Sequence, residues 1–318
     1  MKRNRIILAL TMSLLFTGCG AERNIITETQ VSQEETAQAD QTEETITEET
    51  VQQQVVVSVT SEHFQGASDE SLKDVEYTYE YDMPQITISG NEAAQEKIQK
   101  DLESYVTNFL NSLSQNEFGY IGYMEEGSYT VEPSYQNLSM EVIRADSKVI
   151  SIMLINEGYD HGAHGWVNVD YLNYFTSTGD TITFDALGEG FRDRAKNLVA
   201  AKAAQIQQEE DIFYPDYQDS ISLVVMDGTE SQKEVYNELY GDMDWSNLEE
   251  MKMPPTFYVT DTGFGFTSGQ YTLQPYSAGI IDFTFTAADF DGACTADIFT
   301  DEGAMKRTID EESLIGYR

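Results

Sequence analysis

Two histidines three residues apart are the side chains whose types and spacing best suit chemistry. His161 and His164 lie in the Gly-rich stretch 159–165 of a chain with three histidines in all. Two imidazoles at this spacing can begin a zinc site, which needs three or four ligands in a tetrahedral array. Asp170 or Glu157 can add an oxygen ligand, but no later histidine or pair of free cysteines completes the set. A Gly-rich strand connection, whose histidine bonds backbone carbonyls, is the simpler interpretation.

Aromatic residues recur mostly at strand or helix spacing, which indicates core positions. Trp166, directly after the Gly-rich stretch, and Trp245 are the exceptions, and they are candidates for contact with a sugar. We therefore name His161, His164 and Trp166 as candidate binding residues. The metal set His161, His164 and Asp170 stays an alternative. We expect no catalytic residue, no bound metal and no cofactor.

Carboxylates suggest two further chemistries. One short stretch is crowded with acidic residues, but their order does not fit an EF-hand calcium loop: Asp289, Asp291, Asp297 and Asp301. Paired carboxylates also hydrolyse glycosidic bonds, and four candidates are available: Glu125, Glu126, Glu157 and Asp170. Spacing selects no pair among 56 acidic residues. A cell-wall hydrolase using carboxylates or a metal near His161 and His164 is the alternative to a non-enzymatic protein.

The first nineteen residues predict export and lipid attachment. A basic start precedes the apolar run 6–16, which is shorter than the roughly 20 residues of a membrane-spanning helix. The run ends in Leu15-Phe16-Thr17-Gly18-Cys19, which resembles the lipobox of bacterial lipoproteins, with Phe16 in place of the usual Leu. The resemblance implies diacylglycerol on the Cys19 sulfur and cleavage before Cys19. We expect a lipoprotein signal peptide over 1–18 and a mature protein anchored to the extracytoplasmic face of the cell membrane.

The charge of the chain restricts its partners. Residues 19–54 are rich in Glu, Thr and Gln and predict a disordered acidic tether. The whole chain has a formal net charge of −38. Such a field repels nucleic acid and favours cations and basic proteins. Solubility in a polyanionic envelope explains the same acidity equally well.

Two groups of periodic segments must position these side chains. In the first, residues 75–81 alternate as a half-buried strand, which Pro84 is expected to break and which resumes over 85–88. Residues 98–113 carry a helical stripe after a capping-box spacing at 89–92. Strands are expected over 129–131, 138–142, 149–155 and 167–175, with a tight turn over 145–148.

The second group mixes helices and strands. Helices are expected over 190–208 and 231–240, and strands over 256–260, 263–267 and 279–286, with a hairpin turn at 261–263. Strands and helices do not alternate strictly along the chain. We therefore predict an α+β fold of antiparallel sheets with two or three helices packed on them.

Four motifs recur in one known extracellular module: His161-Gly162-Ala163-His164-Gly165, the turn Ser177-Thr178-Gly179, the segment 257–263, and Leu273-Gln274-Pro275-Tyr276. With them the chain resembles the RsiV-type extracellular module of Gram-positive bacteria. The resemblance covers about four-fifths of the chain; His161 departs from the usual first Gly. Family members include a membrane anti-sigma factor whose outer domain binds lysozyme and the N-terminal part of a peptidoglycan deacetylase.

The resemblance divides the chain after the tether into two parts of the module, an N-terminal part over 55–158 and a C-terminal part over 159–318. It implies a lipid-anchored binding module at the cell envelope. The implied partners are a cationic protein such as lysozyme, or peptidoglycan. This chain lacks a sigma-binding segment and a deacetylase catalytic domain, so we expect only the extracellular module to be shared and no enzymatic activity.

Overall fold

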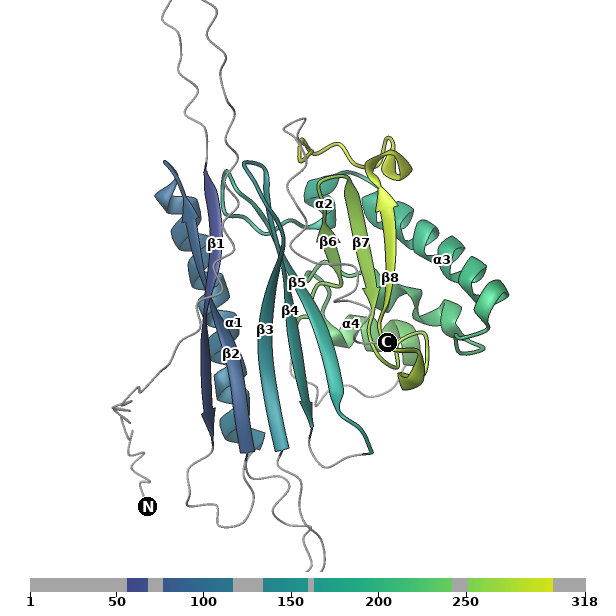
Figure 1. Ribbon diagram of the computed structural model, residues 1–318. Helices are drawn as coiled ribbons and strands as arrows, with labels where there is room; N and C mark the ends of the chain where they lie inside the picture. Colours follow the sequence, from purple (N-terminus) through teal and green to yellow (C-terminus); the bar gives the residue numbers. More distant parts are fainter. Residues whose placement is uncertain (1–55, 68–76, 117–133, 160–162, 242–250, 300–318) are drawn as a thin grey trace, which may run out of the picture.

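Two sheets and the helices around them make up the part of the chain that the computed structural model describes, residues 56–67, 77–116, 134–159, 163–241 and 251–299 (Figure 1). The larger sheet has the strand order β1-β2-β3-β4-β5, formed by β1 (Val57–Ala67), β2 (Tyr77–Ile88), β3 (Ser134–Ala145), β4 (Val149–Tyr159) and β5 (Trp166–Phe175). The smaller sheet has the order β6-β7-β8, formed by β6 (Phe257–Val259), β7 (Gly263–Ser268) and β8 (Ile281–Thr286). The α+β class is confirmed.

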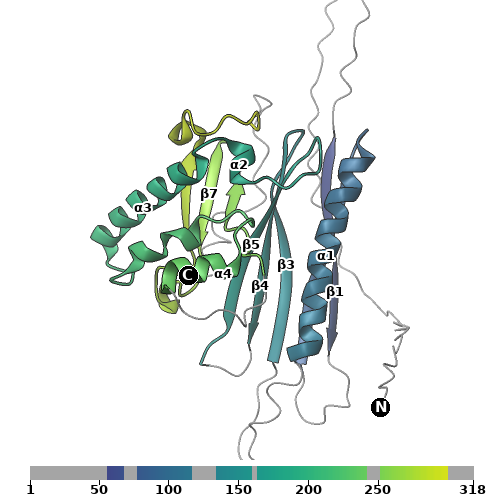
Figure 2. The ribbon, with the colours of Figure 1, turned by 180° about the vertical axis from the view of Figure 1, so that it is seen from behind.

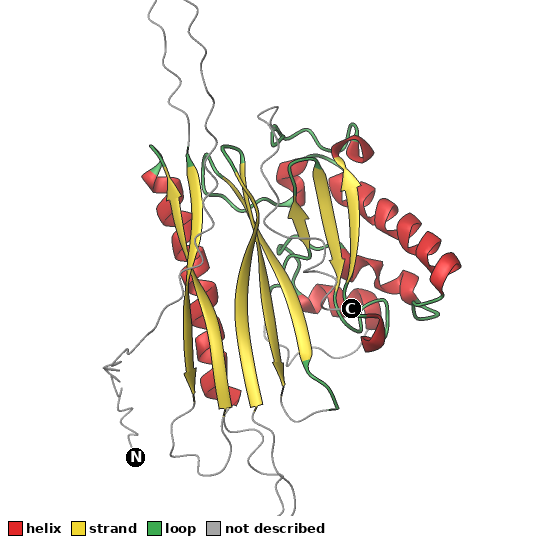
Figure 3. Ribbon diagram, in the orientation of Figure 1, coloured by secondary structure: helices red, strands yellow, loops and turns green. Residues whose placement is uncertain are grey.

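Helices lie on the outer side of each sheet (Figure 3). The α-helices are α1 (Glu92–Asn116), α2 (Phe184–Leu187), α3 (Phe191–Glu210) and α4 (Gln232–Tyr240). Short 3₁₀ helices are η2 (Tyr217–Val224), η3 (Tyr276–Ala278) and η4 (Ala287–Phe290). No helix among the described residues is long and apolar enough to cross a membrane.

The predicted helical stripe is the buried face of α1, which lies along β1 and β2 (Figure 2). Its buried residues Ile98, Leu102, Val106, Phe109 and Leu113 belong to one core with side chains from all five strands of the larger sheet. The cap differs from the predicted spacing. Asn91 Oδ1 accepts from Ala94 N at 3.3 Å, whereas Ser89 Oγ accepts from Val56 N at 2.7 Å and joins β1 to β2.

One strand pair departs from the expected antiparallel arrangement. β2 and β3 are parallel over 77–81 and 134–138, while the other neighbours in both sheets are antiparallel. The reason is that α1 connects β2 to β3. A helical crossover returns the chain to the same end of the sheet and makes the two strands parallel.

The predicted strand segment 85–88 is present, but the predicted break at Pro84 is wrong, because β2 runs without interruption from Tyr77 to Ile88. After Tyr81, β2 no longer pairs with β3. The backbone N–H groups of Ile86 and Ile88 instead donate to Gln99 and Gln95 of α1, each at 2.9 Å. Pro84 lies two residues before Ile86, so its backbone nitrogen points to the same side of β2, toward α1. The N–H that proline lacks would therefore not have bonded to another strand.

The two sheets meet through the face of the larger sheet that α1 does not cover. Ile143, Met153, Ile155 and Tyr171 pack there against Tyr258 of β6. Arg144 of β3 crosses the same junction with its guanidinium buried. It donates to Asp146 at 2.6 Å and to the backbone oxygens of Thr260 and Ile298 at 2.8 and 2.5 Å.

A separate core lies between the smaller sheet and α3. Its centre is a group of phenylalanines whose ring centroids lie 4.6 to 6.3 Å from their neighbours: Phe184, Phe191, Phe257, Phe264, Phe266 and Phe290.

The helices and strands predicted for residues 190–286 are confirmed, with ends shifted by a few residues. The tight turn at 145–148 is confirmed by the bond from Asp146 N to Val149 O at 3.0 Å. The strand predicted over 129–131 lies outside the described residues.

Candidate functional site

Four ring side chains that belong to none of the three cores gather where the two sheets end. We call them the aromatic surface: Tyr135, His164, Tyr271 and Tyr276. Tyr135 comes from β3, His164 from the residues just before β5, and the other two from the β7–β8 connection. Trp166 pairs with Gly158 on the opposite face of the larger sheet, the face that α1 covers. Tyr271 is 55% exposed and Tyr135 is 37% exposed, two of the four exposed large apolar residues among those described.

His164 joins the two sheets at this surface. Its Nδ1 lies 2.7 Å from Gly165 O, which requires Nδ1 to carry a proton and donate. Its Nε2 lies 2.8 Å from the Tyr271 hydroxyl. The imidazole also stacks on Tyr276, with ring centroids 3.6 Å apart and an angle of 18°. Both nitrogens and one face of the ring are therefore engaged by the protein.

Glycines let the rings approach the backbone closely. Trp166 pairs with Gly158 across β4 and β5, and a Cβ atom at Gly158 would lie 2.6 Å from the indole carbon Cζ2. A Cβ at Gly165 would lie 2.9 Å from Gly158 O. Such distances are well below van der Waals contact, so only glycine fits at these two positions. The Gly-rich stretch is therefore a close strand connection that carries Trp166 and His164.

Gln274 fastens the loop that carries Tyr271 and Tyr276. Its side chain is fully buried; Nε2 donates to the backbone oxygens of Ser268, Gly269 and Gly279 at 3.2, 3.1 and 2.8 Å. Its Oε1 accepts from Ser268 Oγ at 2.8 Å. One amide thus ties the start of the loop to its end and holds both tyrosines in place.

Tyr271 has a left-handed backbone conformation, with φ of +63°. This region is unfavourable for a residue with a bulky side chain and persists only where surrounding contacts enforce it. Here the Gln274 bonds and the bond from the Tyr271 hydroxyl to His164 supply those contacts. The exposed tyrosine is therefore held in one orientation before any ligand arrives.

The surface also carries negative charge. Glu157 of β4 lies beside Tyr135, and Asn137 Nδ2 donates to its Oε1 at 3.5 Å. Partial burial raises the pKa of Tyr135 above its ordinary value, and the charges of Glu157 and Tyr276 raise it further. Tyr135 therefore stays a neutral phenol at physiological pH and can donate a hydrogen bond.

The metal alternative predicted from the sequence is not assembled by the residues in view. His161 lies outside the described part of the chain, and Asp170 accepts a hydrogen bond from Tyr105 of α1 on the other face of the larger sheet. Burial raises the pKa of Asp170, although the bond from Tyr105 acts in the opposite direction. Within the described residues, no group of three His, Cys, Asp or Glu side chains is placed to hold a metal ion.

Asp170 belongs instead to a row of contacts between α1 and the strand region around β5. Tyr174 donates to Asp101 at 2.7 Å, Tyr105 donates to Asp170, and Lys97 pairs with Asp180. The helix members are spaced four residues apart, so they lie on one flank of α1. The row fixes the helix against the far edge of the sheet.

The acidic stretch near the C-terminus serves local structure. Asp289 accepts from Thr286 N and Oγ1, both at 2.8 Å, and closes the capping box of η4. Asp297 pairs with Lys148, and Asp301 lies outside the described residues. Of the predicted glycosidase carboxylates, Glu125 and Glu126 are likewise outside, and Glu157 and Asp170 lie on opposite faces of the larger sheet.

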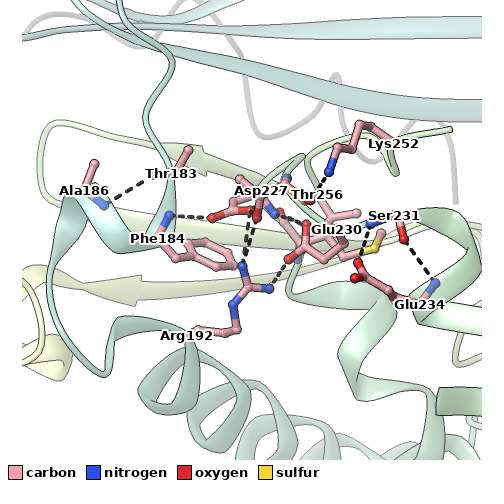
Figure 4. A network of polar contacts seen from close by, with 12 residues as sticks. Thr183, Phe184, Ala186, Arg192, Asp227, Glu230, Ser231, Glu234, Lys252 and Thr256 are labelled. Carbon is pink, nitrogen blue, oxygen red and sulfur yellow. Dashed lines mark hydrogen bonds and ion pairs between the residues drawn. The ribbon is translucent and has the colours of Figure 1, made fainter. Parts of the chain in front are cut away.

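A second polar cluster, in the smaller core, escaped the sequence analysis (Figure 4). Asp227 accepts from Phe184 N at 2.5 Å, from Thr229 Oγ1 at 2.6 Å and from Arg192 Nη2 at 3.2 Å. Arg192 also pairs with Glu230, and its guanidinium carbon lies 4.8 Å from the centre of the Phe184 ring. The cluster ties α2 and α3 to the turn before α4.

Sequence reasoning named His164 and Trp166, of which only His164 belongs to the aromatic surface, and it missed Tyr135 and Tyr271. Tyr135 precedes an alternating strand, where an exposed tyrosine carries no special signal. Tyr271 gains its role from a backbone conformation and from a histidine 107 positions away. Only Tyr276 and Gln274 had a signal, as part of the motif Leu273-Gln274-Pro275-Tyr276.

Two family models match the chain. The family described as Deacetylase PdaC matches residues 70–166, from β2 to the start of β5. The family described as Protein of unknown function (DUF3298) matches residues 210–288, from the end of α3 to η4. The resemblance to an RsiV-type module is confirmed by this pair. Together the matches indicate an extracellular module associated with the cell envelope.

Two solved structures are similar to the chain. A DUF3298 family member from Bacteroides fragilis is 13% identical with a TM-score of 0.47, over 76% of this chain and 94% of that one. A DUF3298 family protein from Pseudomonas aeruginosa is 12% identical with a TM-score of 0.49, over 77% and 97%. No protein with curated annotation matches the sequence.

Proposed function

We propose that this protein is a lipid-anchored, extracytoplasmic binding module that recognises a cationic protein such as lysozyme. The observation that carries the proposal is the aromatic surface, which is exposed and yet held rigid by Gln274 and His164. Tyrosine and tryptophan dominate the energetic centres of protein interfaces. A locked ring loses little further conformational entropy on binding.

Charge supports a basic partner. The chain carries a formal net charge of −38, and Glu157 lies at the aromatic surface itself. A field of this sign accelerates encounter with a cationic protein, while buried apolar and hydrogen-bonded contacts decide which protein stays bound. Acidity thus provides steering, and the rings provide specificity.

The test is lysozyme binding to the full mature chain at two ionic strengths, with cytochrome c as a basic control. The Debye length falls from about 10 Å at 0.1 M salt to about 3 Å at 1 M, which removes long-range attraction. We expect cytochrome c binding to vanish and lysozyme binding to persist at 1 M, weakened by Tyr271→Gly but not by Met251→Ala, a substitution at an equally exposed residue. Equal loss of both proteins at high salt would reduce the proposal to ion exchange.

The anchor is tested separately. Treatment with globomycin, or the change Cys19→Ala, is expected to move the protein from the membrane to the medium. Unchanged mass and membrane retention of the Cys19→Ala variant would refute lipid attachment. Release of muropeptides from purified walls, lost in His164→Ala, would replace binding by hydrolysis as the function.

A further inference from the structure

We propose that the outer edge of β1 is a second binding site, which takes an extended, lysine- or arginine-rich peptide as an added strand of the larger sheet. The site lies apart from the aromatic surface and does not rest on the proposed function. β1 is the first strand in the order β1-β2-β3-β4-β5, so within the described residues only one of its two edges is paired (Figure 1). The free edge of a strand presents a row of N–H and C=O groups with which another chain can pair.

Hydrogen bonds show which backbone groups of β1 point outward. Ser89 N donates to Val56 O at 2.9 Å, so residue 56 directs its backbone groups toward β2. The N–H groups of Ile86 and Ile88 point away from β1, toward α1. This direction alternates from residue to residue in an antiparallel pair, and the register between β1 and β2 shifts nowhere. The residues whose N–H and C=O groups point outward are therefore Val57, Val59, Ser61, His63, Gln65 and Ala67.

β1 lacks the features that usually protect an edge strand. Natural edge strands are short, bulged, covered, or carry lysine or proline. β1 has 11 residues, with no lysine and no proline. On the opposite edge of the sheet, Tyr171 N and Phe175 N of β5 donate to Pro255 O at 3.3 Å and to Asp180 O at 2.9 Å. The edge strands of the smaller sheet, β6 and β8, have only 3 and 6 residues. Among the described edges, β1 is thus the longest and the best suited to accept a strand.

Charge selects the kind of strand that can be added. β1 and β2 contain Glu62, Glu80 and Asp82 but neither lysine nor arginine. Glu62 is exposed, and the Glu80 side chain is 49% exposed. The His63 ring lies 3.1 Å from Asp82 Oδ1 and 3.5 Å from Glu80 Oε2, which places both carboxylates beside β1. Neighbouring strands lie about 4.7–4.9 Å apart, so a long basic side chain on an added strand can reach these carboxylates.

The same charges disfavour a second copy of this chain as the occupant. Pairing of two β1 edges would bring two acidic strands together in molecules that each carry a formal net charge of −38. Like charges on neighbouring strands are destabilising, whereas opposite charges attract. A basic peptide would gain main-chain hydrogen bonds along β1 for affinity, and its alternate side chains would supply specificity.

The experiment measures the fluorescence anisotropy of a labelled peptide of about nine residues, alternating lysine and threonine, with the mature chain at about 0.15 M salt. One control peptide has every backbone nitrogen methylated, so its charge is kept but it cannot donate to β1. The other has glutamate in place of lysine. We expect saturable binding of the parent peptide, at least about tenfold weaker binding of the methylated peptide, and no binding of the glutamate peptide. Equal binding of the methylated peptide would mean ion exchange and overturn the proposal, as would failure of the parent peptide to bind at millimolar concentration.

Variants of β1 locate the site. Ser61→Pro removes an outward N–H from the middle of β1 and no bond to β2, so it is expected to fold and to bind the peptide at least about tenfold more weakly. Ser61→Ala keeps the N–H and should bind within about twofold of the parent chain, as should Met251→Ala. If circular dichroism shows that Ser61→Pro is unfolded, Gln65→Pro replaces it, with an expected loss of about threefold. Full binding by a folded proline variant would place the peptide elsewhere and defeat the inference.

Two further measurements separate the competing occupants and the two proposals. A dimer in sedimentation that Ser61→Pro converts to a monomer would assign the edge to a second copy and overturn the peptide site. Lysozyme is absent from the peptide titrations, so each proposal can fail alone. We expect Ser61→Pro to lose peptide binding and to keep salt-resistant lysozyme binding. Peptide binding that Tyr271→Gly abolishes would place the peptide on the aromatic surface and refute the site at β1.

Discussion

The cluster around Arg192 and the surface around His164 use similar parts in different surroundings. Arg192 lies over the Phe184 ring and pairs with Asp227 and Glu230, and the Asp227 side chain is 1% exposed (Figure 4). His164 stacks on Tyr276 and bonds to Tyr271, which is 55% exposed. In the first region the carboxylate of Asp227 is buried and is satisfied by the half-buried Arg192 and by a backbone N–H. In the second the polar groups hold apolar rings out toward solvent.

This difference separates stability from function. Breaking a buried charged network leaves a charge without its partner, so a mutation in such a network lowers the free energy of unfolding. Rings exposed to water gain little for folding, because burial is what makes an apolar group stabilising. Mutations in the aromatic surface should therefore change binding affinity much more than stability. Mutations in the Arg192 cluster should change stability much more than binding affinity.

The largest effect is expected for Asp227→Ala. The change leaves Arg192 without its buried partner and the backbone N–H of Phe184 without an acceptor. Arg192 keeps its pair with Glu230 and is 32% exposed, so the cost comes mainly from the buried groups that lose Asp227 as acceptor. We expect a loss of about 3 kcal/mol in the free energy of unfolding, measured by urea denaturation. Asp227→Asn keeps an acceptor and should lose less. The affinity of the folded fraction for lysozyme should stay unchanged; a parallel loss of affinity would break the comparison.

Gln274→Ala sharpens the comparison, because this residue is buried like Asp227 of the Arg192 cluster but belongs to the loop of the aromatic surface. Loss of its bonds leaves buried carbonyl groups unsatisfied, which should cost about 2–3 kcal/mol. Ligand binding should weaken as well, because Tyr271 and Tyr276 lose their fixed positions. Denaturation and a lysozyme titration at 1 M salt measure the two effects, and an unaffected titration would show that Gln274 does not order the rings.

A smaller, pH-dependent effect is expected for Asp170→Asn. Burial raises the pKa of Asp170 in the folded protein, so ionisation opposes folding as the pH rises from the unfolded pKa through the folded one. Asparagine still accepts from Tyr105 but carries no charge. The variant should therefore match the parent near pH 4 and exceed it by about 1 kcal/mol at pH 8.

Tyr105→Phe provides the opposite control for Asp170. It removes the hydrogen bond that favours the Asp170 carboxylate, so the parent should lose stability with rising pH less steeply than this variant. Identical pH profiles of the parent and both variants, in urea denaturation, would show that Asp170 does not titrate in the folded protein over this range.

The smallest effect on folding is expected for Tyr271→Gly. Relief of the left-handed conformation stabilises the folded state, and the greater freedom of glycine in the unfolded chain offsets it by a similar amount. We expect the unfolding free energy to change by less than about 0.5 kcal/mol in calorimetry or denaturation. A loss of several kcal/mol would mean that the ring is part of the folding core after all.

Local patterns in the sequence predicted most of the elements. The stripe from Ile98 to Leu113 predicted α1, and alternation predicted β3 to β5, because the side-chain period of a helix or strand is a property of a short segment. Pro84 misled the same reasoning. A proline ends a strand only where its N–H is needed, and Gln95 and Gln99 of α1 had replaced the neighbouring strand.

The sequence by itself determined the acidity of this protein, its Gly-rich connection beside Trp166, and the resemblance that led to its module. Tertiary structure alone decided which side chains surround His164. Tyr271 is 107 residues away along the chain and is brought there by the packing of two sheets and by a loop that Gln274 closes. Spacing in a sequence reports only neighbours on one element, whereas a surface built from several elements depends on how the whole chain packs.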